Sequence, residues 1–361
     1  MFCISHVDMS APVYESPARM TLVSSLALMA DNRIICVYFA AGGIIDGRIS
    51  ADNGRTWGPA FRIMQKPRPD YDAIADATVI VSGKRVIVVA TGVPRPGKPL
   101  VDTYELLQTH SDDFGKTWSS PRVIDINHRL IAASGRAPAI LSDGTILLPV
   151  WWEITSEKLG VEHIHDEGDM VCVSGVLISH DGGERWASSQ DVLGPKREGS
   201  EWPWTADEPA IVAINDRDIF MVMRTLANGR ALESWSHDGG MTWSAAEPGR
   251  CHAYNTPTGL CRLKNGWVVR LWDNSKWRHP LVAAISKDGC KTWSPPRTIM
   301  EWPEGVKSGP VNPQASYPNV VEAADGSLVA TWCVFDAPLE QPDTIWHLVC
   351  GRFSADWVLG R

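Results

Sequence analysis

The sequence predicts an all-β fold, a six-bladed β-propeller, because two independent repeats recur along the chain and helical signals are almost absent. The first repeat is the pattern Ser-x-Asp-x-Gly-x-Thr-Trp, which we call the clip. It occurs at residues 50–57, 111–118, 179–186, 236–243 and 286–293, with Arg185 in place of one Thr and Cys290 in place of one Gly. Asp and Gly suit a tight turn in which the Asp side chain accepts backbone N–H groups. We therefore expect the clip to be a structural turn whose Trp packs between neighbouring sheets.

The second repeat is a hairpin made of a β-rich run, a polar turn and another β-rich run. It occurs six times, with turns at residues 31–32, 82–83, 143–144, 215–216, 265–266 and 325–326. Each of the first five hairpins is followed by one clip, so each unit holds four short strands with the clip between the last two. We expect the sixth unit, which has no clip, to close the ring with both chain termini.

The repeats leave no obvious internal domain boundary. Residues 1–16 are predicted to be irregular, and residues 17–361 to form a single catalytic propeller domain. The polar insert at residues 153–169 contains His163 and His165 and is predicted to be a loop over one face. A flexible loop does not preset the geometry of a metal site, so we expect neither a metal nor another cofactor. A lid or a catalytic His pair is the alternative for this loop.

Charge and composition limit the partners. The net charge is −8, so we expect no broad basic surface for nucleic acid or for an anionic membrane. No apolar run approaches the length of about 20 residues that a membrane helix needs, and the N-terminus lacks the features of a signal peptide. We therefore expect a cytoplasmic protein. The eight Cys show no C-x-x-C spacing, which favours buried free thiols over a zinc site.

The repeat frame brings polar residues together. In a propeller the first strand of each blade lines the central tunnel, so equivalent positions of the six first strands converge at one end. Counted back from each hairpin turn, this position holds Ser24, Asp76, Arg136, Glu208, Thr258 and Tyr317. The far ends of the second strands add Arg224 and Asp273, with Arg278 just beyond. Arginines, carboxylates and a tyrosine at one tunnel end indicate a site for an anionic ligand.

The clips resemble the Asp-boxes, or BNR repeats, of the sialidase (neuraminidase) superfamily, so the propeller is expected to carry five Asp-box turns. The resemblance runs from about residue 24 to residue 357 and implies a glycosidase. Glu208 in Asp-Glu-Pro-Ala-Ile-Val resembles the family's glutamate that pairs with the nucleophile. Tyr317 in Ala-Ser-Tyr-Pro-Asn-Val-Val resembles the nucleophilic tyrosine. Arg224 and Arg278 resemble two arginines of the triad that binds the substrate carboxylate.

The remaining candidates match the family less fully. Asp76 resembles the aspartate that contacts the sugar ring, and Asp46 stands in the loop before the first clip, where the family carries its acid/base aspartate. The family's first triad arginine lies in an Arg-Ile-Pro motif before the first hairpin, but this sequence aligns Leu22 there. Arg19, three residues upstream, is the candidate to replace it. Arg136 comes from the tunnel frame and is expected to bind substrate.

The chemistry of a terminal acidic sugar suits this set of residues. Sialic acid carries a carboxylate on its anomeric carbon, which a guanidinium binds bidentately. That carboxylate would repel an anionic nucleophile, whereas a neutral Tyr deprotonated by a nearby Glu avoids the repulsion. The predicted function is an exo-α-sialidase-like glycoside hydrolase that cleaves a terminal acidic sugar from a glycan with retention. Tyr317 is the predicted nucleophile, Glu208 its base and Asp46 the general acid.

Two other functions remain open. Another Asp-box glycosidase or a polysaccharide lyase could act on uronic-acid glycans, with His252, His279 or the 153–169 loop at the centre of the chemistry. A non-catalytic carbohydrate-binding propeller would keep the arginines and lack the acid.

Overall fold

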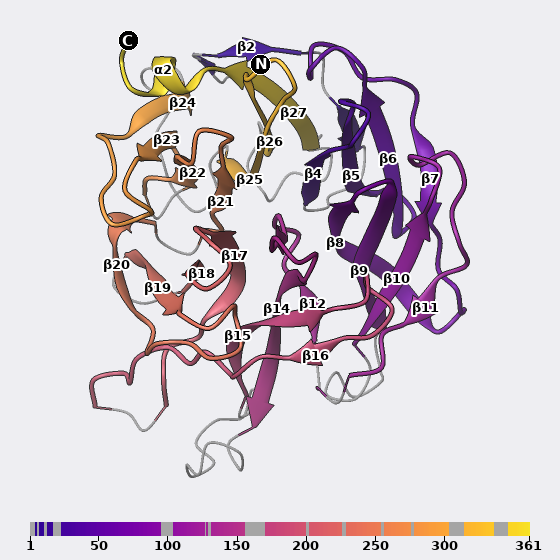
Figure 1. Ribbon diagram of the computed structural model, residues 1–361, viewed down its shortest axis with the longest axis horizontal. Coiled ribbons are helices and arrows are strands. Elements are labelled where there is room, and N and C mark those ends of the chain that lie inside the picture. Colours follow the sequence, from indigo (N-terminus) through magenta and orange to yellow (C-terminus); the bar gives the residue numbers. More distant parts are fainter. Residues whose placement is uncertain are drawn as a thin grey trace.

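The structure is a computed structural model that describes residues 4–5, 7–10, 13–16, 23–94, 104–126, 128, 131–155, 170–199, 202–225, 229–253, 256–275, 278–302, 314–335 and 346–361. Within these residues, six antiparallel sheets form a ring with one strand of each sheet nearest its axis (Figure 1). The six-bladed β-propeller predicted from the sequence is confirmed.

The first three blades follow the chain in order. Blade 1 contains β4 (Ser24–Leu28), β5 (Ile34–Ala40), β6 (Ile44–Ser50) and β7 (Phe61–Met64). Blade 2 contains β8 (Tyr71–Ser82), β9 (Arg85–Pro94), β10 (Glu105–Ser111) and β11 (Arg122–Val123). Blade 3 contains β12 (Ala132–Ala133), β13 (Ala139–Ile140), β14 (Ile146–Thr155), β15 (Met170–Ser179) and β16 (Ala187–Ser188). Its inner position is divided, because β12 and β13 both pair with β14.

The last three blades complete the ring. Blade 4 contains β17 (Asp207–Ala213), β18 (Ile219–Arg224), β19 (Arg230–Ser236) and β20 (Glu247–His252). Blade 5 contains β21 (Gly259–Arg262), β22 (Val268–Asp273), β23 (Leu281–Ser286) and β24 (Arg297–Glu301). Blade 6 contains β25 (Gln314–Glu322), β26 (Leu328–Phe335) and β27 (Trp346–Phe353), and the short helix α2 (Ala355–Val358) follows it.

The N-terminal segment differs from its prediction. Residues 1–16 were expected to be irregular, but β1 (Ile4–Ser5) pairs with β24, and β2 (Asp8–Met9) and β3 (Tyr14–Ser16) pair with β27. These short strands occupy the outer edges of blades 5 and 6, where backbone N–H and C=O groups need partners. Blade 6 therefore combines strands from both ends of the chain, which confirms the expected closure of the ring.

Hydrophobic side chains hold neighbouring blades together. The described residues form six buried clusters, and each joins two adjacent blades. In one of them, Leu147 and Val176 of blade 3 pack with Ile211 and Met221 of blade 4. A sheet stacked between two neighbours is covered on both faces, which explains why β22 and β23 are buried along their whole length.

The clips lie between the third and fourth strands of blades 1 to 5, as predicted. In blade 2, the hydroxyl of Ser111 donates to Asp113 Oδ1 at 2.7 Å, and it accepts the backbone N–H of Gly115 at 2.8 Å. Asp113 also accepts the backbone N–H of Thr117 at 2.9 Å and its hydroxyl at 2.7 Å. In blade 3, Arg185 takes the place of this Thr and donates through Nε to Asp181 Oδ2 at 2.9 Å.

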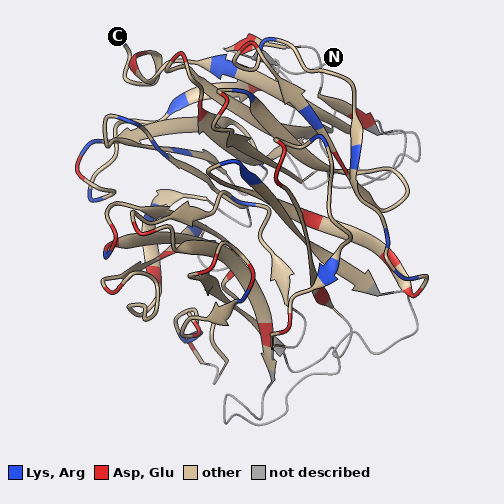
Figure 2. Ribbon diagram, turned by 45° about the vertical axis from the view of Figure 1, so that its right-hand side comes forward, with Lys and Arg blue, Asp and Glu red and all other residues tan. Residues whose placement is uncertain are grey.

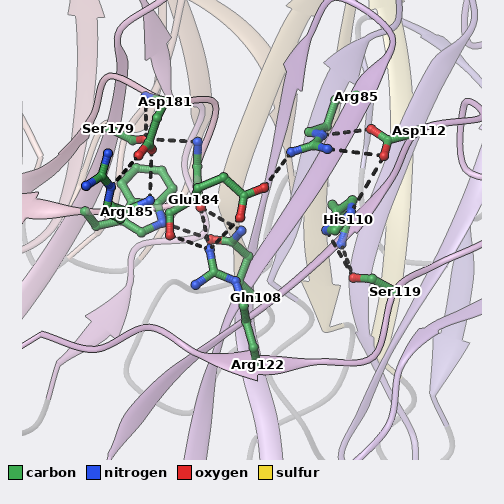
Figure 3. Close-up of polar contacts among 12 residues, drawn as sticks. Arg85, Gln108, His110, Asp112, Ser119, Arg122, Ser179, Asp181, Glu184 and Arg185 are labelled. Atoms are coloured by element: carbon green, nitrogen blue, oxygen red, sulfur yellow. Dashed lines mark hydrogen bonds and ion pairs between the residues drawn. The ribbon is translucent and has the colours of Figure 1, made fainter.

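The clip of blade 3 also binds blade 2 (Figure 3). Gln108 of β10 donates to the carbonyl O of Gly183 at 2.9 Å and accepts the indole N–H of Trp186 at 2.8 Å. Beside it, Arg85 of β9 forms an ion pair of 2.8 Å with Glu184. The clip Trp residues pack against clusters that each join two blades. The structural role predicted for the clip is confirmed.

Positive and negative side chains are mixed along the described part of the chain (Figure 2), and the described cysteines are not paired. In the view of Figure 2, Lys and Arg are interspersed with Asp and Glu along the described ribbon. All seven cysteines in the described part of the chain are free, and four of them are buried. Among the described residues, no helix is long and apolar enough to cross a bilayer.

Candidate active site

Three alternate inner strands carry the same backbone irregularity. The pairing register shifts between Ala75 and Thr78 in β8, between Asp207 and Ala210 in β17, and between Ser316 and Asn319 in β25. The residues in these bulges with left-handed φ are Asp76 (51°), Glu208 (42°) and Tyr317 (59°).

A bulge re-aims a side chain relative to a regular strand. Residues other than Gly rarely adopt a left-handed φ, and such strained residues cluster at functional sites. Blades 2, 4 and 6 therefore present three of the residues predicted by the repeat frame through one shared local geometry.

Tyr317 lies close to two arginines. The guanidinium carbon of Arg278 is 5.4 Å from the centre of the Tyr317 ring, and that of Arg136 is 5.5 Å from it. Tyr317 is only 8% exposed. Burial and the charge of Glu208 raise the pKa of Tyr317 to about 12, while Arg278 and Arg224 oppose the rise. The phenol is therefore neutral near pH 7.

Glu208 and Arg224 form an ion pair next to this tyrosine. The distance from Arg224 Nη1 to Glu208 Oε1 is 2.9 Å, and both side chains are largely buried. Burial lowers the pKa of Arg224, but the carboxylates of Glu208 and Asp207 outweigh it and leave the pKa above its usual value. The second carboxylate oxygen of Glu208, Oε2, is buried without a hydrogen-bond partner, so it is free to accept a proton or a ligand hydroxyl.

Two further carboxyls, the partly buried Asp76 and the fully buried Asp273, interact with arginines of this group and have pKa values raised towards neutral pH. Burial and the Glu208 charge raise the pKa of Asp76 to about 7, and Arg136 opposes the rise. Asp273, at the end of β22, is fully buried. Burial raises its pKa to about 8 against the opposing charge of Arg278. Both groups can therefore hold a proton under physiological conditions.

Asp207 was not predicted as a site residue. It pairs in register with Arg224, and its Oδ1 lies 4.0 Å from Arg224 Nε. Burial and the neighbouring Glu208 raise the pKa of Asp207 to about 7. The only signal in the sequence was its position directly before Glu208, which in a regular strand would place the two side chains on opposite faces. In the bulge, the carboxylates of Asp207 and Glu208 both lie within 4.0 Å of the Arg224 guanidinium.

Unpartnered polar atoms accompany these residues. Glu208 Oε2, and Thr258 Oγ1 directly before β21, are buried and make no hydrogen bond within the described residues. About nine in ten buried polar groups in proteins are hydrogen-bonded, so such atoms favour a ligand that offers hydrogen-bonding groups. Among the described residues, no group of three or more His, Cys, Asp or Glu is arranged to hold a metal ion.

Asp46 is not brought to this group. It was predicted to lie in a loop, but it lies within β6, where its partner across the pair is Tyr38 of β5. Its carboxylate binds Arg62 of β7, with 2.5 Å between Oδ1 and Nε. The predicted residues that the structure brings together are Asp76, Arg136, Glu208, Arg224, Arg278 and Tyr317. Arg19, His163 and His165 lie outside the described residues.

A second arrangement, Ser119 with His110 and Asp112, has the composition of a catalytic triad (Figure 3). Ser119 Oγ lies 3.1 Å from His110 Nδ1, and His110 Nε2 lies 3.7 Å from Asp112 Oδ2. However, Ser119 Oγ also accepts the backbone N–H of His110 at 3.0 Å. Ser244 and Ser294 accept the equivalent N–H in blades 4 and 5 without a histidine. Ser119, the residue directly after the clip of blade 2, therefore has the same structural role as Ser244 and Ser294.

Comparisons with known proteins agree with the fold. Residues 44–329 match the family model of the BNR repeat-like domain. Curated sialidases from Paraclostridium sordellii and Bacteroides fragilis (strain YCH46) are each 25% identical, over 55% and 70% of this chain respectively. These alignments cover 49% and 48% of the two relatives, so the chain spans about half the length of the curated proteins it matches.

The solved structure of a Hadza microbial sialidase superposes on this chain with a TM-score of 0.71 at 16% sequence identity. The superposition covers 94% of this chain and 66% of the sialidase chain. At that identity the likeness shows the fold alone.

Proposed function

The chain belongs to the family of BNR repeat-like domains, and on this basis we propose that it is an exo-α-sialidase-like glycoside hydrolase. It removes a terminal acidic sugar, sialic acid or a related sugar, from a glycan with retention of configuration. One observation carries the proposal: a neutral, buried Tyr317 lies 5.4 Å from the guanidinium of Arg278 and is electrostatically coupled to the Glu208–Arg224 ion pair. The names of the curated relatives support the same reaction class.

In this proposal the arginines bind the substrate carboxylate and the tyrosine attacks the anomeric carbon. Arg224 and Arg278 supply bidentate donors to the carboxylate. Glu208 takes the phenolic proton as the bond from Tyr317 Oη to the anomeric carbon forms and the bond to the leaving group breaks. A water molecule then displaces Tyr317, and two inversions at the same carbon give net retention.

We assign the general acid to Asp76, whereas the sequence favoured Asp46. Asp76 is carried on the inner strand of blade 2 and interacts with Glu208 and Arg136. Its pKa of about 7 keeps a large fraction of the carboxyl protonated at neutral pH. Asp46 is engaged by Arg62 on the outer part of blade 1.

A fluorogenic aryl α-sialoside and sialyllactose together test the proposal. We expect turnover of both by the wild type, and loss of turnover in Tyr317→Phe. A good aryl leaving group needs little protonation, so Asp76→Asn should reduce kcat/KM on sialyllactose by about 10²- to 10⁴-fold and affect the aryl sialoside less. A loss confined to Asp46→Asn would return the acid role to Asp46.

Other results would favour the alternatives. No turnover of any sialoside by the wild type refutes the sialidase assignment. An absorbance rise from an unsaturated uronate product would indicate a lyase. Glycan binding without turnover would indicate a carbohydrate-binding propeller.

A further inference from the structure

Tyr317 adopts a backbone conformation that its own sequence disfavours. Its φ is 59°, in the left-handed region that residues other than Gly rarely adopt. The next residue is Pro318, and a residue before proline is pushed towards extended conformations by the proline ring. Such a conformation persists only where the surrounding structure imposes it. The contacts that impose the left-handed φ of Tyr317 therefore help to determine where its phenol points.

Two buried side chains hold the peptide units that follow the tyrosine. Arg136 donates through Nη1 to the carbonyl O of Pro318 at 3.0 Å. Asn319 donates through Nδ2 to the carbonyl O of Gly135 at 2.9 Å and also to that of Ser24. These hydrogen bonds fasten the bulge of blade 6 to the inner positions of blades 1 and 3. We call Arg136 and Asn319 the bulge clamp.

Blade 5 approaches the same peptide. A Cβ atom added to Gly259 of β21 would lie 2.7 Å from the carbonyl O of Pro318 and 3.2 Å from its carbonyl carbon. Contacts below 3.0 Å do not occur for real Cβ atoms, and both of these atoms belong to the backbone. Glycine is therefore the residue that lets β21 pack against the bulge. Blades 1, 3 and 5 all contact the segment that carries Tyr317.

Arg136 is too deeply buried to act as a simple substrate ligand. It is 1% exposed, whereas Arg224 has a side-chain exposure of 21%. Its guanidinium lies 5.5 Å from the Tyr317 ring centre, its Nη1 donates to the carbonyl O of Pro318, and its Nε and Nη2 are buried without a hydrogen-bond partner among the described residues. The sequence-based expectation that Arg136 binds substrate does not account for these contacts.

We propose that Arg136 and Asn319 are positioning residues that hold the Tyr317 bulge, so that the phenol faces the anomeric carbon of the substrate. The inference rests on the proposed function for the reactive role of Tyr317. It assigns to Arg136 an action through the tyrosine and its backbone, not a contact with the sugar.

Kinetics of clamp variants test this role. A displacement of a reacting group by about 1 Å can cost about 100-fold in rate, so Arg136→Met and Asn319→Ala should lower kcat by about that factor with little change in KM. Arg136→Lys should recover part of the loss, because the ammonium can still donate to Pro318. Thr109→Val is the matched control, since it removes a hydrogen bond of 2.6 Å from the buried Thr109 of β10 to the carbonyl O of Ser119, in the outer part of blade 2, and should retain kcat.

A crystal structure of Asn319→Ala gives a readout that does not depend on activity. We expect Tyr317 to relax to a negative φ, with its ring displaced from Arg136 and Arg278. If φ stays near its present value and kcat is unchanged, the clamp has no positioning role. A rise in KM with unchanged kcat in Arg136→Met would show that Arg136 binds substrate instead. If the wild type turns over no sialoside, the proposed function fails while the structural test of the clamp still stands.

Discussion

Replacing Asp273 with Asn should make the protein more stable than the wild type at alkaline pH and leave it little changed at acidic pH. Burial raises the pKa of Asp273 to about 8, whereas an Asp in an unfolded chain titrates near about 3.9. Between these values the folded protein keeps a proton that the unfolded chain has released, so the wild type loses stability as pH rises. The loss is about 1.4 kcal/mol per pH unit, on the order of 5 kcal/mol over the whole window as an upper value.

Calorimetric melting at about pH 5, 6.5 and 8 measures this effect. A change of 1 kcal/mol shifts the Tm of a chain of this size by roughly 2 °C, so the Tm of the wild type should fall several degrees relative to Asp273→Asn across the series. Asn cannot titrate, and its amide occupies the space of the protonated carboxyl. Thr331→Val, an equally buried but non-titrating change, should keep the wild-type pH profile. Parallel profiles of the wild type and Asp273→Asn would refute the reasoning, because they would show that the carboxyl is ionised in the folded protein.

Three further predictions follow from other charged groups. Hydrogen bonds from Thr292 lower the pKa of Asp288 to about 2, so Asp288→Asn should lower Tm at pH 7, and the difference should close as pH falls from about 4 towards 2. The Arg270 side chain is 0% exposed and forms an ion pair of 2.8 Å with Glu233. Glu233→Gln should therefore lower the free energy of unfolding by about 3–5 kcal/mol, because it leaves a buried charge unpaired. A loss below about 1 kcal/mol in denaturant titrations would contradict this. If Asp76 is the acid, kcat on sialyllactose should fall as pH rises above about 7, and a flat profile up to about pH 9 would exclude it.

The fold was predictable because its signals are local. Each clip closes its own turn through hydrogen bonds within eight residues, as Ser111 and Asp113 show. Each hairpin turn carries residues that tolerate a left-handed φ, such as Gly266 at 85° and Gly326 at 81°. The strands of residues 4–16 could not be predicted in the same way, because segments of two or three residues have no periodicity. They form only by pairing with the edges of β24 and β27.

The failed placement of Asp46 has an identifiable cause. The family resemblance placed Asp46 in a loop before the first clip, and Asp46-Gly47 is also a common turn sequence. In the structure Gly47 is a strand residue that allows close packing between strands, since a Cβ there would meet Ile63 Cδ1 at 2.6 Å and Phe61 at 3.0 Å. The dipeptide alone does not distinguish a glycine needed for a turn from one needed for close approach. Only the pairing of β6 with both β5 and β7 does so.

The candidate site shows a limit of a different kind. Counting residues back from the turns identified Asp76, Glu208 and Tyr317, because blade geometry repeats. It could not show that all three sit in bulges with left-handed φ, since none of them is a Gly or Asn and the register shifts depend on neighbouring strands. For the same reason the pairing of Asp207 with Arg224 was not visible.

Contacts between blades give two of the three bulges a common explanation. Blades 2, 4 and 6 carry the strained residues, and inner positions of blades 1 and 3 hold the bulges of blades 2 and 6 in place. Ser25 Oγ of blade 1 accepts the backbone N–H of Val79 just after the bulge of blade 2, at 3.2 Å. Asn319 binds carbonyl groups of blades 1 and 3 just after the bulge of blade 6. Since a bulge leaves backbone groups without ladder partners, these inter-blade bonds both satisfy the backbone and fix the direction of the side chain that the bulge presents. Substitutions at Ser25 or Asn319 should therefore change the site without altering any residue that faces it.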